Sequence, residues 1–512
     1  MMRQAAGTAL PRHPVEGTVA VAGVPMPAGA GTKSSKAGAG SKNSAAGASI
    51  KSSAAGEGVR SSAVGAGVKS SAVGAAALAG MLGWLLLGDL GIAMRDRAAL
   101  PSALELLRVA GASDTATSLL LSTVPALLSM FIVPIVGWRS DRHRGRLGRR
   151  RPFLLVAAPA GCLALLGLAF SPALGAAFDA ALGDWSPGAR FCRLAAFGLF
   201  WTLFDCAALC ALSLFTGLVN DVVPFGWLGR FYALFRIVGL GAGIAFHTWV
   251  FALTDHHLSA ILACTGLVFG GCLVAMCVAV REPPAPAVAV DVADVADAAD
   301  GAGSAGSPEP AARGPGLPRG FMTPPILWAV AMFVCAAITF NPFNTFYQFF
   351  AHASAVPKAT LGMLTAVGYA VSIGSAFAIG WLVDRCGAMR ISALVMTLYC
   401  ALASLGALVV DDAASFQAIY LCHVIVSGAW WTAAASMPMA LFPRERFVQF
   451  NASKDFVVVS ASILLGIVQG PLLDLSGHDY RLTLGCGAVF SALCLVCLAR
   501  LRALHPPGTR NT

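Results

Sequence analysis

The sequence predicts an all-α membrane protein with twelve transmembrane helices arranged in two halves of six. Apolar residues make up 57% of the 512 residues and charged residues only 12%, whereas a soluble globular chain carries roughly 25% charged residues. Runs of apolar residues recur along the chain at about the 20-residue length that a helix needs to cross a bilayer. This composition excludes a soluble enzyme, a disordered protein and a nucleic-acid-binding protein.

The chain divides into five regions by composition. Residues 1–74 are rich in Ala, Gly and Ser, and a nine-residue repeat begins at Lys33, Lys42, Lys51, Arg60 and Lys69. Such small side chains cannot build a core, so we expect a disordered, basic, cytoplasmic tail. It either touches anionic lipid headgroups or is a neutral low-complexity expansion. The other regions are a six-helix half at 75–280, a Pro-, Ala- and Gly-rich cytoplasmic linker at 281–325, a second six-helix half at 326–503 and a C-terminal tail at 504–512.

Each half is expected to hold six spans, all long enough to cross the bilayer as helices. The expected spans are 76–94, 117–137, 152–171, 195–219, 231–253, 258–280, 326–350, 360–383, 391–410, 415–440, 456–474 and 483–502. With a cytoplasmic N-terminus, the cytoplasmic loops and C-terminus carry 19 of the 35 Lys and Arg residues, and the outer loops carry 7. The positive-inside rule then places both termini in the cytoplasm. We expect a multi-pass protein of the plasma (inner) membrane.

One motif occurs in both halves. The loop after the second span reads PIVGWRSDRHRGRLGRRRPFLL from Pro134, and the loop after the eighth reads GWLVDRCGAMR from Gly380. Both contain G-W-x-x-D-R, and such an internal repeat indicates a transporter built from two parallel halves. We expect the Gly to let the backbone of a neighbouring helix approach closely. We expect the Asp to face a helix N-terminus and to pair with the arginines. The cluster would then hold the halves together at the cytoplasmic side. Its residues are Gly137, Asp141, Arg142, Gly148, Arg149, Arg150, Arg151, Gly380, Asp384 and Arg385.

These two loops resemble the signature of the major facilitator superfamily. The first loop is similar to that of the sucrose/proton symporters, in the glycoside-pentoside-hexuronide:cation symporter group, which reads like P-I-V-G-x-x-S-D-R and then R-x-G-R-R-R-P-F. The resemblance implies the major facilitator fold over about residues 76–503, and proton-coupled sugar transport. The matching residues are Pro134, Ile135, Val136, Gly137, Ser140, Asp141, Arg142, Arg146, Gly148, Arg149, Arg150, Arg151, Pro152 and Phe153.

A carboxylate lies inside the fourth expected span. Placing Asp205 at membrane depth costs at least about 2.5 kcal/mol, so such a residue is a functional candidate by default. Burial also favours proton binding by a carboxyl group near neutral pH, as proton coupling requires. A structural Asp, protonated or paired with an arginine, is the alternative. A mostly polar stripe at helical spacing can line a water-filled cavity; it comprises Thr202, Asp205, Leu209, Ser213, Thr216 and Asn220.

The resemblance gives Asp205 a specific role. Sucrose symporters carry Phe-Trp a few residues before an Asp and a second Asp sixteen residues after it, similar to Phe200, Trp201, Asp205 and Asp221. The family's first Asp couples transport to protons, so the resemblance implies this role for Asp205. In this chain the Phe-Trp pair lies one residue further from the Asp, and Thr216 stands where the family has its sugar-binding arginine.

Polar residues of two further spans are candidate substrate ligands. Arg236, in the fifth span, can hydrogen-bond paired sugar hydroxyls or serve as the counter-ion of Asp205, and a snorkelling arginine is the alternative. Amides and an aromatic ring on one face of the seventh span suit a neutral sugar, and interhelical hydrogen bonding is the alternative. Together with Thr216 of the fourth span, the candidates are Arg236, Asn341, Asn344, Tyr347 and Gln348.

Two other groups of polar residues are open to more than one interpretation. Asp89 in the first span, followed by Arg95, Asp96 and Arg97, either closes the outer side or forms an ordinary interface cluster. His247 and His423 can titrate, and we interpret them as packing histidines.

The function predicted from these patterns is proton-coupled symport of a sugar, a glucoside such as sucrose or maltose. The proton is the expected coupling ion, and we expect no other cofactor, no metal, no nucleic acid and a monomer. A P-loop is absent from the sequence and we find no acid–base or metal constellation, so an enzyme is not predicted. A sodium-coupled symporter or an exporter of the same fold is one alternative, and a non-transporting membrane sensor or scaffold is another.

Overall fold

The named elements of the structure are all helices. This computed structural model describes residues 79–223, 225–282, 318, 320–443 and 446–504. The expected tail at 1–74 and most of the linker at 281–325 and of the C-terminal tail at 504–512 lie outside the described residues.

Six helical runs precede residue 283. The described part of the first begins at residue 79 and continues through η1 (Arg95–Ala99) and α2 (Leu100–Val109). The second joins α3 (Asp114–Ser118), η2 (Leu119–Thr123) and α4 (Val124–Arg142). The others are α5 (Arg151–Ala169), α7 (Ala189–Val222), α8 (Phe225–Ala245) with η4 (Phe246–Val250) and η5 (Phe251–Leu253), and α9 (Thr254–Ala279). A short helix that was not predicted, α6 (Ser171–Leu182), and η3 (Gly183–Trp185) lie between α5 and α7.

Six further runs follow residue 320, so the described part of the chain holds the expected twelve. They are α11 (Pro324–Ala353), α12 (Lys358–Cys386), α13 (Ala388–Val409), α14 (Ala413–Ala434) with α15 (Met437–Leu441), α16 (Phe447–Leu475) and α17 (Arg481–Leu504). Among the described residues, 10 helices are long and apolar enough to cross a membrane, and one of these, Phe231–Ala279, contains two of the expected spans. The predicted fold class is confirmed.

The first helical run is longer than predicted. The expected span ended at residue 94 because Arg95, Asp96 and Arg97 have the composition of an outer loop. In the structure the helix passes through these charges as the π-helical turn η1 and ends at Val109. The described part of this helix, 79–109, is about 46 Å long, and Arg95 lies near the middle of that part. The charges therefore lie inside a long helix and not in a loop.

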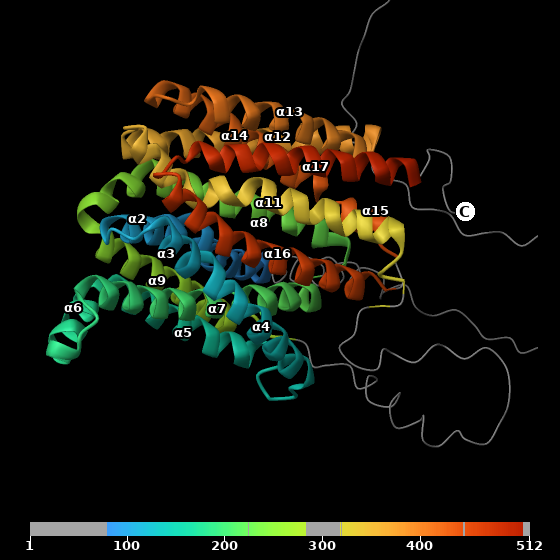
Figure 1. Cartoon of the computed structure of the whole chain (residues 1–512). Coiled ribbons are helices and arrows are strands. Elements are labelled where there is room, and N and C mark those ends of the chain that lie inside the picture. The colour runs from blue at the N-terminus through green and yellow to red at the C-terminus, as the bar shows by residue number, and fades with distance from the viewer. Residues whose placement is uncertain (1–78, 224, 283–317, 319, 444–445, 505–512) are drawn as a thin grey trace, which may run out of the picture. The chain divides into compact units, whose positions relative to one another are not determined.

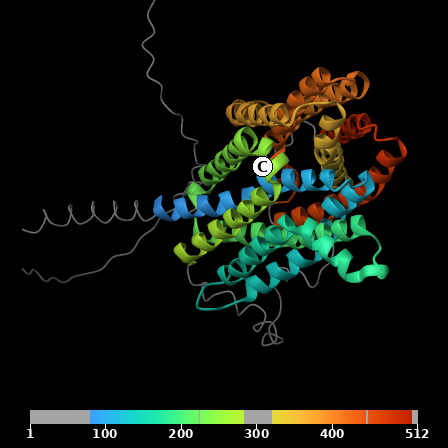
Figure 2. The same cartoon turned by 90° about the vertical axis from the view of Figure 1, so that its left-hand side faces the viewer.

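The two halves pack their helices in the same pattern. In the first half α5 packs on α9 and α7, and in the second half α13 packs on α17 and α14. Likewise α4 contacts α7 and α12 contacts α14. The shared pattern agrees with the repeated loop motif. Figures 1 and 2 show α12, α13 and α14 on the side of the bundle away from α4, α5 and α6.

Helices of both halves meet along two seams. In one, α8 and η4 contact α12; in the other, α16 contacts α3, η2 and α4. Figure 1 shows α16 beside α3 and α4 although about 330 residues separate them in the chain.

We name the two ends of the bundle by their loops: the 110–113 end, after α2, and the 143–150 end, after α4.

Candidate functional site

A cavity of about 590 Å³ lies between the halves. Its walls come from the first run, α7, α8 and η4 in one half and from α11, α12 and α14 in the other. Small-ligand sites have volumes of roughly 300–1,000 Å³, so a sugar-sized molecule fits this space. Charged groups concentrate on its first-half wall, namely Asp89, Arg95, Asp96, Arg97 and Arg236.

Asp205 is paired with Arg95 at mid-depth. The carboxylate is buried near the middle of α7, which runs from Ala189 to Val222. Oδ1 of Asp205 accepts from Nε of Arg95 at 2.8 Å and lies 2.6 Å from its Nη2. Nη1 of Arg95 lies 2.6 Å from Oδ1 of Asp96. The side chain of Asp205 is 5% exposed and that of Asp96 is 57% exposed. One guanidinium therefore joins a buried acid to an acid that faces the cavity.

Arg236 is not the counter-ion of Asp205 in this structure, which corrects the prediction. Its Nη2 donates to Oγ1 of Thr432 at 2.8 Å and to Oγ of Ser372 at 3.3 Å. Its Nε is buried without a hydrogen-bond partner among the described residues. The sequence could not select Arg95 over Arg236 because the predicted first span ended before Arg95. Arg236 does line the cavity, and its role as a substrate ligand stays a prediction.

Only two of the four polar candidates on α11 line the cavity. Asn344 and Tyr347 do so. Asn341 accepts from Thr345 within its own helix at 3.1 Å, and Nε2 of Gln348 donates to the Pro101 carbonyl of the first half at 3.1 Å. Positions seven apart share a helix face but lie about 10 Å apart along the axis, so they meet different neighbours.

Thr216, the remaining candidate ligand, does not line the cavity either. Its hydroxyl donates to the backbone carbonyl of Leu212, one turn earlier in α7, at 2.8 Å. Residue Leu212 of the same helix lines the cavity, whereas Thr216 is not among the lining residues.

A buried hydrogen-bonded chain orients Asn344. Nδ1 of His423 lies 3.0 Å from the Tyr399 hydroxyl, and Nε2 lies 3.0 Å from Oδ1 of Asn344. Tyr399 and His423 are both 1% exposed. If the Tyr399 hydroxyl donates to Nδ1 of His423, then Nε2–H of His423 donates to Oδ1 of Asn344. Both buried donors of this hydrogen-bonded chain are then used. The amide N–H groups of Asn344 are then left to face the cavity.

At the 110–113 end, Asp474 of α16 caps the first helical turn of α3. Its carboxylate accepts from the backbone N–H groups of Asp114 and Thr115 at 2.9 Å each, and from the Thr115 hydroxyl at 2.5 Å. Gly470 permits this approach, since a Cβ there would lie 2.5 Å from the Thr115 Cα. A helix N-terminus favours a carboxylate because its first N–H groups lack partners within the helix.

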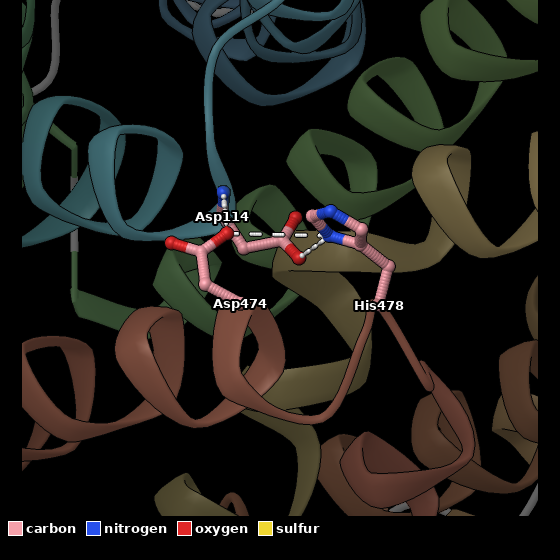
Figure 3. Close-up of side chains that lie close together, drawn as sticks. All are labelled: Asp114, Asp474 and His478. Atoms are coloured by element: carbon pink, nitrogen blue, oxygen red, sulfur yellow. Dashed lines mark hydrogen bonds and ion pairs between the residues drawn. The ribbon is translucent and has the colours of Figure 1, made fainter.

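Asp114 completes this contact from the other side. Its buried carboxylate accepts from the Tyr480 hydroxyl at 3.0 Å. The same carboxylate lies 2.7 Å from Nδ1 of His478 (Figure 3). The hydrogen bond to Asp114 raises the pKa of His478 above its usual range. Possible ligand atoms of Asp114, Asp474 and His478 lie within 4.8 Å of one another. Both carboxylates are already occupied by N–H and O–H donors, so this cluster, which we call the latch, is a closed hydrogen-bonded contact between the halves.

A second contact joins the halves beside the latch. Glu105 of α2, 1% exposed, lies 3.0 Å from Nζ of Lys358, the first residue of α12. Lys358 also pairs with Asp255 of α9, and Arg108 donates to Glu105 at 3.1 Å through Nε. Both contacts lie on the same side of the cavity, because Glu105 is about 15 Å from Arg95 along the helix. At the 110–113 end the halves are therefore joined by these two contacts.

At the 143–150 end the motif arginines bond within the first half. Arg149 and Arg150 donate to Asp221 of α7 at 2.8 Å each, and Arg150 also lies 3.2 Å from Asp141, the expected pairing. Gly148 has a φ of +94°, which a side chain rarely adopts, and it turns the N–H groups of the next two residues to Glu282 at 2.8 and 2.9 Å. Arg151 donates to the Cys277 carbonyl at 2.8 Å.

Among the described residues, these arginine bonds therefore do not join the halves, unlike the prediction for this motif. A Cβ added at Gly137 or Gly380 would meet no described atom within 4 Å, so the expected close backbone approach is also absent. Arg142 stacks on Trp138 at 4.0 Å, and Arg385, which follows Asp384, stacks on Trp381 at 5.2 Å. The repeated motif thus makes the same stacking contact in each half.

Sequence reasoning missed the residues that close the 110–113 end. Asp114, Asp474 and His478 come from helix ends about 360 residues apart, and no local pattern connects them. Glu105 was detectable, because an acid inside an apolar helix predicts a buried partner. Its partner, Lys358, lies outside the expected spans, between 326–350 and 360–383.

Comparison with known proteins identifies the fold. The family described as MFS/sugar transport protein matches residues 106–445. No curated protein matches the sequence. Three solved structures share the fold at low identity. The nucleoside transporter NupG is 13% identical, with a TM-score of 0.57 over 83% of this chain and 99% of NupG. An inward-facing bacterial homologue of the iron transporter ferroportin is 15% identical, with a TM-score of 0.59 over 82% of this chain and 98% of the homologue. A D-xylose-proton symporter is 14% identical, with a TM-score of 0.56 over 82% of this chain and 97% of the symporter.

Proposed function

We propose that this chain, which belongs to the MFS/sugar transport protein family, carries a sugar across the membrane together with a proton. The finer assignment is symport of a sucrose- or maltose-like glycoside by alternating access of a central cavity. The resemblance of its first motif loop to the sucrose/proton symporters supports this substrate, and so do the cavity's size and its mixture of amide, hydroxyl and aromatic groups. A xylose-proton symporter with the same fold is consistent with proton coupling.

The observation that carries the proposal is the ion pair between Arg95 and Asp205. A buried ion pair is stable only while both partners are charged. When Asp205 binds a proton, Arg95 is left with Asp96 and with free donors directed at the cavity. A guanidinium can then hydrogen-bond two sugar hydroxyls. Loss of the proton restores the pair and withdraws the donors, which links proton release to sugar release.

The second wall of the site supplies fixed donors. The chain from Tyr399 through His423 holds Asn344 with its amide N–H groups toward the cavity, and Arg236 adds its guanidinium. Tyr347 offers a ring against which a sugar face can stack. On this proposal the sugar is held between a proton-sensitive wall in the first half and a fixed wall in the second half.

Closure at one end supports alternating access. The positive-inside rule assigns the 143–150 end to the cytoplasm and the 110–113 end to the outer side. The latch and the Glu105–Lys358 pair then close the outer side, and the bonds of Arg149 and Arg150 stay within one half at the cytoplasmic side. The proposed state is inward-facing, as is the ferroportin homologue of similar fold.

The available driving force is sufficient for accumulation. A membrane potential of 100 mV offers about 2.3 kcal/mol per charge. One pH unit adds about 1.4 kcal/mol. Together they sustain a sugar gradient of roughly 500-fold at one proton per sugar.

The test is uptake into proteoliposomes that contain the full chain. Labelled sucrose and maltose are followed under an inward proton gradient, without a gradient, and under a sodium gradient. We expect proton-driven accumulation that Asp205→Asn abolishes and that Asp184→Asn, an exposed acid, leaves intact. Sugar exchange between equal pools should survive in Asp205→Asn, because the amide resembles a permanently protonated acid.

Each other outcome selects an alternative. Accumulation driven only by sodium replaces the coupling ion. Net efflux under the same gradient indicates an exporter. Accumulation that persists in Asp205→Asn removes Asp205 as the proton site. Transport of no sugar in a wide panel favours the sensor or scaffold.

A further inference from the structure

An apolar groove of about 460 Å³ opens on the outer surface of the first half, apart from the central cavity. It lies between α4, α5 and α7, which Figure 1 labels next to one another. Its walls are almost entirely hydrocarbon, and three of its lining residues are alanines. The lining residues are Ile132, Val136, Pro152, Phe153, Val156, Ala157, Ala160, Cys206, Ala207 and Cys210, with His143 at one end.

The groove is oriented toward the bilayer. Val156, on its wall, is 71% exposed and Ile132 is 37% exposed. These residues lie within helices long and apolar enough to span the membrane, so acyl chains are the solvent that meets them. The His143 ring packs edge-on against Phe153 at 5.6 Å and marks the end of the groove nearest the 143–150 loop.

A cluster of arginines begins where the groove ends. Arg139, Arg142, Arg144 and Arg146 are all exposed. The one acid among residues 139–146 is Asp141, and it is already paired with Arg150. Arg142 is held over the Trp138 ring at 4.0 Å, and Trp138 is 59% exposed. Tryptophan and arginine together are typical of the headgroup level of a membrane.

From this juxtaposition we infer that the groove and the 139–146 arginines form a binding site for an anionic phospholipid. One acyl chain lies along α5 between α4 and α7, and the phosphate lies against the arginines. A neutral lipid can fill the groove but gains nothing from the arginines. Soluble polyanions, including RNA and acidic peptides, can meet the arginines but cannot use the groove. Basic pockets between membrane helices are recognised sites for anionic headgroups.

The test is native mass spectrometry of the full chain with phosphatidylglycerol and phosphatidylcholine of equal chain length. We expect retained phosphatidylglycerol adducts and weak phosphatidylcholine adducts. Arg144→Gln with Arg146→Gln should weaken phosphatidylglycerol binding by about 30-fold, if each arginine contributes as a basic residue near an anionic surface does. Arg385→Gln with Arg390→Gln removes the same charge from the corresponding loop of the second half, and should leave binding unchanged.

The groove is tested separately from the charge. Ala207→Phe fills it and should lower phosphatidylglycerol binding while all the arginines remain. Because this variant can misfold, the wild-type chain is also labelled with phosphatidylglycerol that carries a photoreactive group on its acyl chain. We expect labels within 152–160 and 206–210. Equal binding of both lipids, labels spread over all helices, or equal losses in the two arginine double variants would overturn the site.

Discussion

Removing the Asp474 carboxylate should open the latch at the 110–113 end. In the closed state this carboxylate accepts two backbone N–H bonds at 2.9 Å and one hydroxyl bond at 2.5 Å, all from the first turn of α3. Ser113 accepts one further N–H, so α3 keeps part of its cap in Asp474→Ala. Loss of a capping side chain costs up to about 2 kcal/mol. In an open state Asp474 is solvated, and its loss costs little there.

The difference between the states sets the expected size of the effect. About 2 kcal/mol shifts the ratio of closed to open molecules by roughly 30-fold. The assay is hydrogen exchange of the full chain in detergent, read on peptides that cover residues 112–120. The amides of Ala116 and Thr117 keep their acceptors on Ser113 in this variant. They should exchange roughly 30-fold faster in Asp474→Ala.

A matched control is available at the same end. Asp479 bonds to Arg481, two residues away. Asp479→Ala should therefore leave exchange over 112–120 unchanged. Unchanged exchange in Asp474→Ala, or the same acceleration in both variants, would refute the argument that Asp474 holds the halves together.

Two further predictions concern histidines. The hydrogen bond to Asp114 raises the pKa of His478 in the closed state. The protonated His478 therefore stabilises closure fully below the ordinary histidine pKa. This stabilisation is lost as the pH rises through the raised pKa. Exchange over 112–120, corrected for its intrinsic pH dependence, should accelerate as the pH rises above about 6.5 in the wild type and not in His478→Gln. His423→Phe removes the partner that orients Asn344. If one hydrogen bond of about 1.4 kcal/mol to the sugar is lost, the KM for the transported sugar should rise about tenfold. The maximal rate should change little. A KM equal to that of the wild type would contradict that orienting role.

Much of the architecture follows from local sequence. The twelve helical runs follow from apolar segment length, because burying backbone polar groups in lipid requires continuous helices. The motif shared by Gly137 and Gly380 predicts the two halves, and the same packing pattern occurs in both. Asp205 is notable from sequence alone, because an acid at the centre of an apolar run is costly.

The sequence determined that Asp205 and Arg236 lie inside apolar spans, and the tertiary structure decided which charged groups meet them. Arg95 was placed in a loop because hydropathy averages a local window, and only the continuing helix carries it to the depth of Asp205. Arg236, the expected partner, bonds instead to Ser372 and Thr432 on helices of the other half. Asp114 and Asp474 meet across 360 residues. Contacts of this kind depend on how rigid helices dock, and the order of residues within one helix does not encode the docking.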